Sequence, residues 1–497
     1  MNRWPTEVIA SRTGPRRPKG LASPLIPAVF SLVSILVAWL AVTRLGVNGL
    51  VLVLGGLSGF VLLAYISLRD LTVALLIWLF SMGSLRLVGL VGMPGLPDFS
   101  FDRLFLVWII LMYLFRLIRE RERIEGPFVA DVLIILHTVY VLVQLNIFDS
   151  PHFHVWVLSN LSPVFGYLYG RHIVKEEKQL RMLLMFFIVL TVYYWFTAFA
   201  EKFGWHSLVW PKQILDPAVG FAPEGRVRGP MVHPPLFGQM LSMFILIYIF
   251  LLARQPRIVT RVFLLLSMGL TGVSLLFTYT RGPWLATAVA LVTLAVLRDS
   301  FRRVLIGMAV LSLILGALGL YQMANTEFLQ ERMENTNTIE NRLSFLSTAL
   351  RMIRDHPFFG VGFFRFNDYR DDYNQATYVP FYGLVRKRMG EGMVIHDIYL
   401  GRLAEEGLLS VILMFGFYIV VGRAWLRQWR AEPRGPWFNR DFLALVAGMM
   451  TSYLIGGMII DFRYFDLVNV VFALLAGILY GYRSHHYARP AIMKARG

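Results

Sequence analysis

The chain contains no cysteine, and charged residues are scarce for its length. Its 497 residues include Cys 0, and Asp, Glu, Lys and Arg together make up 16% of them. The lack of cysteine excludes disulfide bonds and thiolate metal sites. The sequence also lacks a Walker A motif, which argues against an ATPase, and it lacks the HExxH type of metal-ligand spacing. We therefore expect no bound metal and no cofactor.

The sequence is rich in long apolar runs. Hydrophobic residues make up 57% of the chain, whereas soluble domains contain roughly 45–50%. Runs of about 20 residues cross a bilayer as helices, and the runs lack the strict alternation of barrel strands. The sequence predicts an all-α polytopic integral membrane protein with about fourteen spans. They lie near residues 25–43, 47–67, 71–91, 104–118 (short enough to be re-entrant), 128–148, 154–171, 180–200, 236–253, 262–279, 282–298, 303–321, 398–422, 441–460 and 465–482.

The distribution of basic residues predicts the orientation. The formal net charge is +17, which by itself could indicate a nucleic acid partner. Most Lys and Arg residues, however, fall in alternate connections, as the positive-inside rule requires. We expect both termini in the cytoplasm and no nucleic acid partner. The predicted regions are a basic tail at 1–24, eleven spans over 25–321, a large extracytoplasmic loop at 322–397, three spans over 398–483 and a tail at 484–497.

The large loop contains a predicted amphipathic helix. Asn337 and Glu340 have the spacing of a capping box, and His356-Pro357 would end the helix. Glycines at 360 and 362 predict a turn after it. We expect this helix to rest on the outer membrane surface. Its apolar positions recur at helical spacing, at Leu343, Leu346, Leu350 and Ile353.

Four arginines on the predicted outer face lie outside any run of charge: Arg226, Arg228, Arg281 and Arg342. Arg281 lies in a tight turn between two apolar helices, where an ionisable group is rare without a partner. It could extend to lipid headgroups or cap a carbonyl. Alternatively, several guanidinium groups that converge would suit a diphosphate, which arginine can bind through two donors.

Two further segments suggest sugar chemistry. His396 lies where the large loop returns to the membrane, and histidine can transfer a proton near neutral pH; it could equally be a hydrogen-bonded interfacial residue. The aromatic stretch from Phe358 to Tyr382 is either an interface belt or a stacking surface for sugars. The candidate acceptor or sugar-binding residues are Asp371, Asp372, Tyr373 and Glu405.

Four fragments together resemble the superfamily of O-antigen ligases and Wzy-type polysaccharide polymerases. They are RVRGPMVHPPLFG from Arg226, TYTRGPWLATAVALV from Thr278, NRLSFLSTALRMIRDHPFFGVGFF from Asn341 and HDIYLGRLAEEGLL from His396. Their order, their predicted outer location and the large loop before the histidine agree with the family. Thr280 replaces the usual serine, and Pro235 stands where the family often has asparagine, so no role of that asparagine is carried over.

The resemblance implies a GT-C-like glycosyltransferase in the bacterial inner membrane. Such enzymes transfer glycan from an undecaprenyl-diphosphate carrier to a sugar hydroxyl of an acceptor glycan, without a metal ion. Arg226 and Arg281, with Arg228 and Arg342 as weaker candidates, would bind the diphosphate, and His396 would activate the acceptor. We expect a polymerase; a ligase that transfers finished glycan to lipid A core or protein is the alternative. A flippase for lipid-linked glycans and a scaffold for other glycan-assembly proteins, such as a chain-length regulator, are further alternatives.

The topology can be tested with reporter fusions. We expect fusions at Glu125 and Arg430 to report the cytoplasm and a fusion at Asn374 to report the outside, because alternation from a cytoplasmic N-terminus places them so. Asn374 on the cytoplasmic side would place every candidate site residue on the wrong face.

Overall fold

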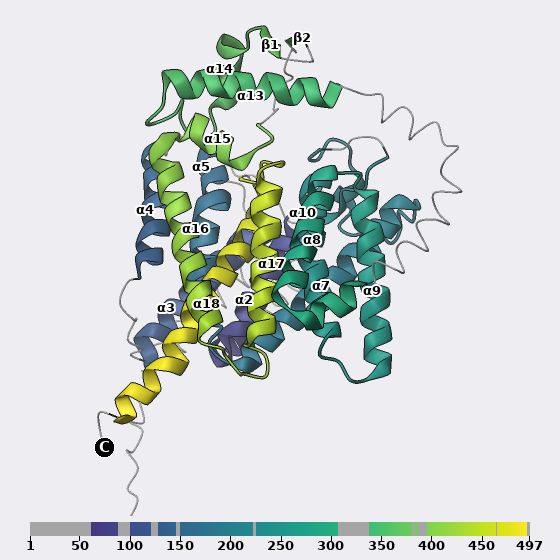
Figure 1. Cartoon of the computed structure of the whole chain (residues 1–497), viewed down its shortest axis with the longest axis vertical. Coiled ribbons are helices and arrows are strands. Elements are labelled where there is room, and N and C mark those ends of the chain that lie inside the picture. Colours follow the sequence, from purple (N-terminus) through teal and green to yellow (C-terminus); the bar gives the residue numbers. More distant parts are fainter. Residues whose placement is uncertain are drawn as a thin grey trace, which may run out of the picture. The chain divides into compact units, whose positions relative to one another are not determined.

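The computed structural model describes residues 61–87, 100–120, 128–145, 150–221, 225–306, 337–379, 383–385, 395–463 and 465–494. The account below concerns the unit from Ser67 onwards. It is almost entirely helical (Figure 1). The first elements in chain order are α2 Leu71–Phe80, π-helix η1 Ser81–Leu85, α3 Phe101–Glu120, α4 Val129–Val143, α5 Ser150–Trp156, π-helix η2 Val157–Leu161 and α6 Ser162–His172. They are followed by α7 Glu177–Lys202, 3-10 helices η3 Lys212–Leu215 and η4 Gly229–Met231, α8 Pro234–Leu252, α9 Ile258–Phe277 and α10 Arg281–Leu297. The last described elements are α13 Asn337–Asp355, α14 Phe366–Tyr373, antiparallel strands β1 Thr377–Val379 and β2 Gly383–Val385, α15 Ile398–Glu405, α16 Gly407–Arg430, α17 Arg440–Gly457 and α18 Asp466–Lys494.

The helices have the length and composition of membrane spans. Among the described residues, four helices, α7, α8, α9 and α16, are long and apolar enough to cross a bilayer. Shorter apolar helices run over Leu71–Leu85, Val129–Val143, Arg281–Leu297 and Asp466–Tyr482. The helices are those of a helical membrane protein, whereas the count of fourteen spans and the GT-C-like architecture stay predictions. The predicted spans at 25–43 and most of 47–67 and 303–321 lie outside the described residues.

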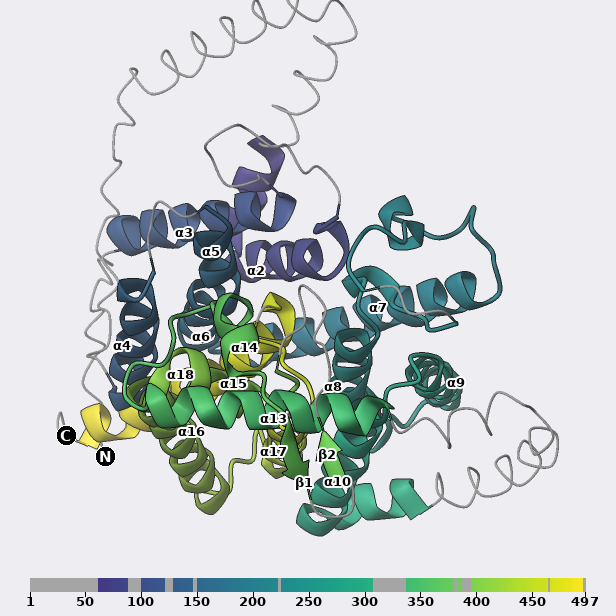
Figure 2. The ribbon, with the colours of Figure 1, turned by 90° about the horizontal axis from the view of Figure 1, so that it is seen from above.

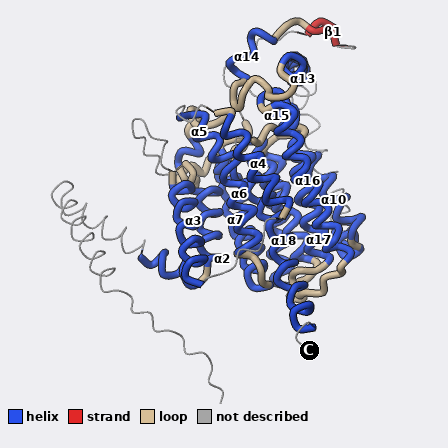
Figure 3. Tube along the Cα trace, turned by 90° about the vertical axis from the view of Figure 1, so that its left-hand side faces the viewer, coloured by secondary structure: helices blue, strands red, loops and turns tan. Residues whose placement is uncertain are grey.

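Helix α8 forms the centre of the bundle. Every residue from Leu236 to Leu252 is buried, and α8 packs against α7, α9, α10 and α17. A helix that is apolar on all sides belongs inside a protein. Helix α8 is therefore enclosed by its neighbours along its length. Helices α13, α14 and α15 lie together beyond one end of the other helices (Figure 3).

Glycines bring α6 and α18 into close contact. A Cβ atom on Gly170 would lie 2.2 Å from the carbonyl oxygen of Leu474, and one on Gly477 would lie 2.0 Å from that of Tyr167. No side chain fits in that space, so the two backbones touch. Small residues allow this approach in membrane helices, where packing replaces the hydrophobic effect as the force between helices.

The boundaries differ from the prediction in two places. The predicted span 398–422 is divided, because Gly407 has φ +79° and separates α15 from α16. Helix α18 continues to Lys494, through most of the segment 484–497 that we expected as a tail. The run 154–171 forms one continuous helical stretch from Ser150 to His172, with a π-helical turn in its middle.

Helix α13 lies across the ends of the other helices, packed on α15 (Figures 1 and 2). The helix itself begins and ends as the sequence indicated. Phe345, Ala349 and Met352 are buried against the protein, whereas Leu346 and Leu350 of the predicted apolar stripe are 41% and 52% exposed, and their contact with a membrane surface stays a prediction. Two apolar stripes share this helix, and the one that contains Phe345 faces the protein.

The turn after α13 holds the junction between α15 and α16. The amide of Val361 donates to the carbonyl of Ala404 at 3.0 Å, and the amide of Leu408 donates to the carbonyl of Pro357 at 2.9 Å. Gly407 lies against this turn, and a Cβ atom there would meet the Phe358 carbonyl oxygen at 2.2 Å. The glycine is thus required both by its φ and by the close approach.

Replacement of Gly407 tests this junction. We expect Gly407→Ala to destabilise the protein by on the order of 1–3 kcal/mol, because alanine is strained at positive φ. The measurement is the melting temperature of the purified protein in detergent. Gly422→Ala, in the same helix with nothing within 4 Å of the added Cβ, is the control and should not lower the melting temperature. Equal effects of the two substitutions would contradict this role of Gly407.

Candidate functional site

His396 is fixed between α15 and α13. The next residue, Asp397, caps α15, and its carboxylate accepts the amides of Tyr399 and Leu400 at 2.8 Å each. This cap ends the loop and leaves His396 just before the helix. The imidazole lies edge-to-face on the ring of Phe345 in α13, with centroids 5.7 Å apart and planes at 77°. Although it makes this contact, the residue as a whole keeps much of its surface exposed.

Arg281 is held by the tight turn between α9 and α10. The hydroxyls of Thr278 and Thr280 share a hydrogen bond of 2.6 Å. The indole of Trp284 donates back to the Leu275 carbonyl at 3.1 Å. Tyr279 has φ 48°, a conformation that costs energy for a residue other than glycine. The turn therefore fixes Arg281 as the first residue of α10, with its side chain exposed.

The segment with Arg226 and Arg228 runs beside that turn. The amide of Val227, between the two arginines, donates to the carbonyl of Phe277 at the end of α9, at 3.0 Å. Arg228 is 5% exposed, and its guanidinium donates to the carbonyls of Val219 and Asp216 at 2.8 and 2.6 Å. Arg226 is half-buried. The structure thus places both arginines near Arg281. The hydrogen bonds of Arg228 hold the conformation of its own loop.

Electrostatic interactions connect His396 to the arginines. Burial by the surrounding protein lowers the pKa of His396 below the ordinary 6.5, the charge of Arg342 lowers it further, and Asp461 opposes both. Burial and the charge of Arg281 lower the pKa of Arg342 in turn. Arg281, Arg342 and His396, predicted from three separate segments, are therefore brought together at one end of the helices.

Arg281 and Arg342 have no acidic partner among the described residues. Within the part of the chain that the structure describes, no carboxylate lies within 4.0 Å of either guanidinium. Other arginines at this end are paired: Arg402 with Glu406 and Arg463 with Glu405. Two like charges near one another are unfavourable unless an anion joins them. The arrangement is suited to a ligand with more than one negative charge.

A second histidine, His233, lies at the same place. It precedes α8, and its ring packs between Phe221 and Phe465, with centroids 5.4 and 5.2 Å away. Burial lowers its pKa to about 4, and the charge of protonated His396 adds to this. Its Nδ1 atom is buried without a hydrogen-bond partner. The residue before it, Val232, has φ 48°, a strain that is found most often at functional sites.

The sequence motifs do not single out His233 as a functional residue. The one signal for a role is its place directly before the prolines that begin α8, inside the family-like segment. Arg86 is likewise not indicated by any motif, but its guanidinium lies over the ring of Phe465, at 5.8 Å from the centroid. Neither association can be read from spacing, because the contacts join segments more than a hundred residues apart.

Glu405 belongs to a buried ion cluster beneath α15. Arg463 donates to the Glu405 carboxylate at 2.9 Å and to both oxygens of Asp461 through a two-donor contact. Arg402 donates to both oxygens of Glu406 at 2.8 Å. The sequence suggested Glu405 as a sugar ligand, which stays untested, but its carboxylate is 1% exposed. The observed contacts give it a structural role.

The cluster fixes neighbouring segments as well. Glu405 also accepts the amide of Phe366 at the start of α14, at 3.0 Å. From α4, Tyr140 donates to the Glu406 carbonyl at 2.8 Å and Gln144 donates to the Phe359 carbonyl at 2.9 Å. Helix α15, the turn after α13 and the C-terminal end of α4 are thus held as one piece.

The remaining acceptor candidates lie on α14. Asp371 and Asp372 are exposed and Tyr373 is half-buried. The ring of Tyr373 lies 6.5 Å from that of His356, and its carbonyl accepts from Arg351 at 3.0 Å. These contacts place the three residues beside the end of α13, whereas His396 contacts Phe345 in its middle. Their sugar-binding role stays a prediction.

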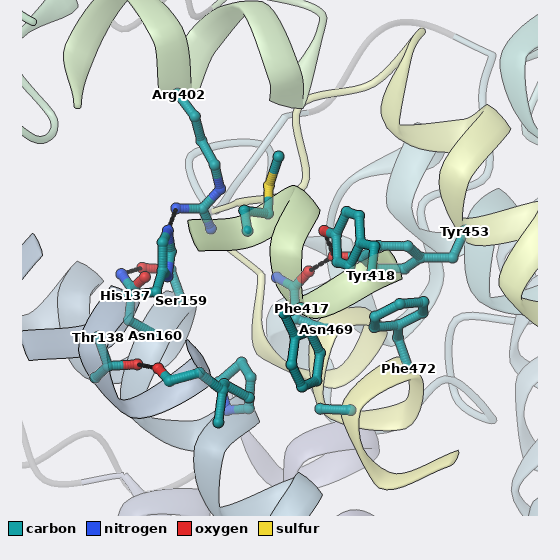
Figure 4. A pocket seen from close by; sticks show the side chains of 14 residues that line it. His137, Thr138, Ser159, Asn160, Arg402, Phe417, Tyr418, Tyr453, Asn469 and Phe472 are labelled. Atoms are coloured by element: carbon teal, nitrogen blue, oxygen red, sulfur yellow. Dashed lines mark hydrogen bonds between the residues drawn. The ribbon is translucent and has the colours of Figure 1, made fainter. Parts of the chain in front are cut away.

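A small cavity lies below the ion cluster, between α4, α6, α16 and α18 (Figure 4). Arg402 and His137 form its polar end, with their nitrogens 3.3 Å apart. Tyr453 donates to Asn469 at 2.8 Å on the opposite wall. Its volume of about 60 Å³ is enough for a few waters and too small for a lipid-linked glycan.

Metal ligands were not expected from the sequence. Among the described residues, no group of three or more His, Asp or Glu side chains is arranged to hold a metal ion. The acidic groups near His396 are engaged by arginines instead. Metal independence remains a prediction to be tested on activity.

The fold and the site define a helical membrane protein with a cationic, histidine-containing site at one end of its helices. The family model described as O-antigen ligase matches residues 266–415, so the resemblance predicted from the sequence motifs is confirmed. The matched region includes Arg281, Arg342 and His396; Arg226 and His233 precede it. No curated protein matches the chain.

The lowered pKa of His396 can be measured directly. We expect labelling of His396 by diethyl pyrocarbonate, quantified by peptide mass spectrometry, to fall with a midpoint below pH 6.5, because only neutral imidazole reacts. Arg342→Gln should move that midpoint upward, since one positive charge that disfavours protonation is removed. A midpoint at or above 6.5, or one that Arg342→Gln does not change, would refute this electrostatic coupling.

Proposed function

We propose that this chain is a membrane polysaccharide polymerase that acts on the outer face of the bacterial cytoplasmic membrane. It would transfer glycan from an undecaprenyl-diphosphate donor to a hydroxyl of an acceptor glycan. The observation that carries the proposal is the pair of guanidinium groups, Arg281 and Arg342, that lie beside His396 and have no acidic partner in the described part of the chain. A diphosphate supplies the missing negative charge, and arginine can bind it through two donors.

The proposed chemistry is a displacement at the anomeric carbon of the donor sugar. The acceptor hydroxyl oxygen forms the new bond, and the bond from the anomeric carbon to the phosphate oxygen breaks. His396 takes the hydroxyl proton as the bond forms and later releases it to water. Because the pKa of His396 is below its ordinary value, the imidazole is neutral and able to accept a proton at neutral pH.

The arginines would stabilise the leaving group. Negative charge accumulates on the diphosphate as the sugar leaves, and fixed positive groups directed at that charge lower the barrier. We assign Arg281, Arg342 and Arg226 to this contact. Arg228 donates to two backbone carbonyls, so we propose that it positions Arg226. The unpartnered Nδ1 of His233 would accept a hydrogen bond from a substrate hydroxyl.

A ligase is the second candidate, and the description of the matching family as O-antigen ligase favours it. Both reactions use the same donor and differ in the acceptor. The glycan profile of a deletion strain separates them: loss of a polymerase leaves single repeat units, whereas loss of a ligase leaves long glycan on the carrier lipid. Long glycan on the carrier would overturn the polymerase proposal.

Turnover by purified protein separates an enzyme from a flippase or a scaffold. We expect the protein in detergent, with no membrane gradient, to consume lipid-linked donor. We also expect this turnover to continue in EDTA, because arginines take the place of a metal ion. An unchanged donor would contradict an enzymatic role. Loss of turnover in EDTA with recovery in Mg²⁺ or Mn²⁺ would refute metal independence and reopen Asp371, Asp372 and Asp461 as ligands.

Arg281→Lys tests the two-donor contact. We expect this variant to be nearly as inactive as Arg281→Ala, because lysine keeps the charge but lacks the planar pair of donors. Donor turnover by the two purified variants is the measurement, and Arg354→Lys, on the exposed surface of α13, is the matched control. A lysine variant that keeps most of the activity would make Arg281 a charge that sets topology or contacts headgroups.

A further inference from the structure

A second basic site lies at the other end of the helices. A polar pocket of about 230 Å³ opens between the end of α10 and the loop that joins α16 to α17. Helix α16 has 24 residues and is therefore about 36 Å long. It separates this pocket from α15 and the site around His396 (Figure 1). The pocket is lined by Arg298, Glu432, Pro433, Arg434, Asn439, Arg440 and Asp441.

The loop that forms the pocket is held in one conformation. Arg434 and Asn439 form an antiparallel backbone bridge across it, and Glu432 has φ 48°. From α7, the carboxylate of Glu177 accepts the amides of Trp437 and Phe438 at 2.7 and 3.0 Å. The pocket is thus preformed, and a preformed site binds without the cost of ordering a loop.

The charge of the pocket is positive. Three arginines and two carboxylates line it. Asp441 pairs with Arg298 at 2.6 Å, and Glu432 pairs with Arg440 at 2.6 Å. Within the described ranges, no carboxylate lies within 4.0 Å of Arg434. The Nε of Arg440 is also buried without a hydrogen-bond partner. The positive charge of Arg434 and the buried Nε donor of Arg440 therefore remain for a ligand that accepts hydrogen bonds.

Aromatic residues place this pocket at the depth of lipid headgroups. The guanidinium of Arg440 lies over Trp429, 5.4 Å from the ring centroid, and that of Arg254 lies over Trp437 at 5.6 Å. Tryptophans gather where a membrane helix leaves the hydrocarbon, beside the headgroups. Basic pockets between helix ends at this level bind the phosphates of anionic lipids. A soluble phosphate has no acyl chains, so a position at headgroup depth would not strengthen its binding.

We propose that the pocket formed by Arg298, Arg434, Arg440 and their neighbours binds the phosphodiester of an anionic membrane lipid. The guanidinium of Arg434 and the Nε of Arg440 donate to the phosphate oxygens, and the acyl chains lie along the apolar helices. The site is separate from the candidate donor site, so it does not depend on the proposed function. By the predicted topology it faces the cytoplasmic leaflet.

Native mass spectrometry of the purified full-length protein in detergent tests this proposal. The probes are dioleoyl phosphatidylglycerol and dioleoyl phosphatidylcholine, which have the same chains and differ in headgroup charge. We expect tighter binding of phosphatidylglycerol, weakened about five-fold in Arg434→Gln, since one arginine near a membrane surface contributes about 1 kcal/mol. The control is Arg427→Gln, at the same end of α16 but outside the pocket, which should keep the wild-type affinity.

Three results would overturn the proposal. The first is equal binding of the two lipids by the wild-type protein. The second is an Arg434→Gln variant that binds phosphatidylglycerol as the wild type does, or a control variant that is weakened equally. The third is displacement of the lipid by glycerol 3-phosphate at equal concentration, which would make the ligand a soluble phosphate. Arg434 makes no ion pair with a described residue, so its loss leaves the fold in place and each result is interpretable.

Discussion

The position of His396 depends on a buried cluster of charges beneath α15. Arg463 joins Glu405 to Asp461, and Arg402 holds Glu406. Buried charges are tolerated when they are paired, and removal of one partner costs about 3–5 kcal/mol. The Glu405 carboxylate also accepts backbone amides after α13, and Tyr140 of α4 donates to the backbone carbonyl of Glu406. The cluster and its backbone therefore set where the large loop meets the helices. A change in any member would move the imidazole relative to the arginines.

The site above the cluster has the opposite character. Arg281 and Arg342 are exposed and have no carboxylate within 4.0 Å among the described residues, while Arg402 and Arg463 below each form an ion pair. The segments that lead into it also carry backbone strain, at Val232 and Tyr279. Such strain persists only where the surrounding structure enforces it. The ion cluster thus supports an exposed cationic surface, an arrangement that suits the diphosphate leaving group proposed above.

Much of this organisation could be predicted from the sequence, because hydropathy and the family-like motifs depend on local pattern. The same reasoning did not predict the break between α15 and α16 at Gly407, because an apolar run gives no sign of a residue with a left-handed φ. Helix α13 has two apolar stripes, and only tertiary contacts show that the one through Phe345 faces the protein while Leu346 and Leu350 stay exposed. The ring contacts of His233 and the ion pair of Glu405 join partners far away in sequence, so spacing alone does not predict them.

The most direct test of the central claim is a structure of the protein with undecaprenyl diphosphate bound in a lipid nanodisc. Our account predicts phosphate oxygens within hydrogen-bond distance of the guanidinium groups of Arg281 and Arg342, with the imidazole of His396 open toward the bound diphosphate. A diphosphate bound elsewhere, with these two arginines directed at lipid headgroups, would contradict it.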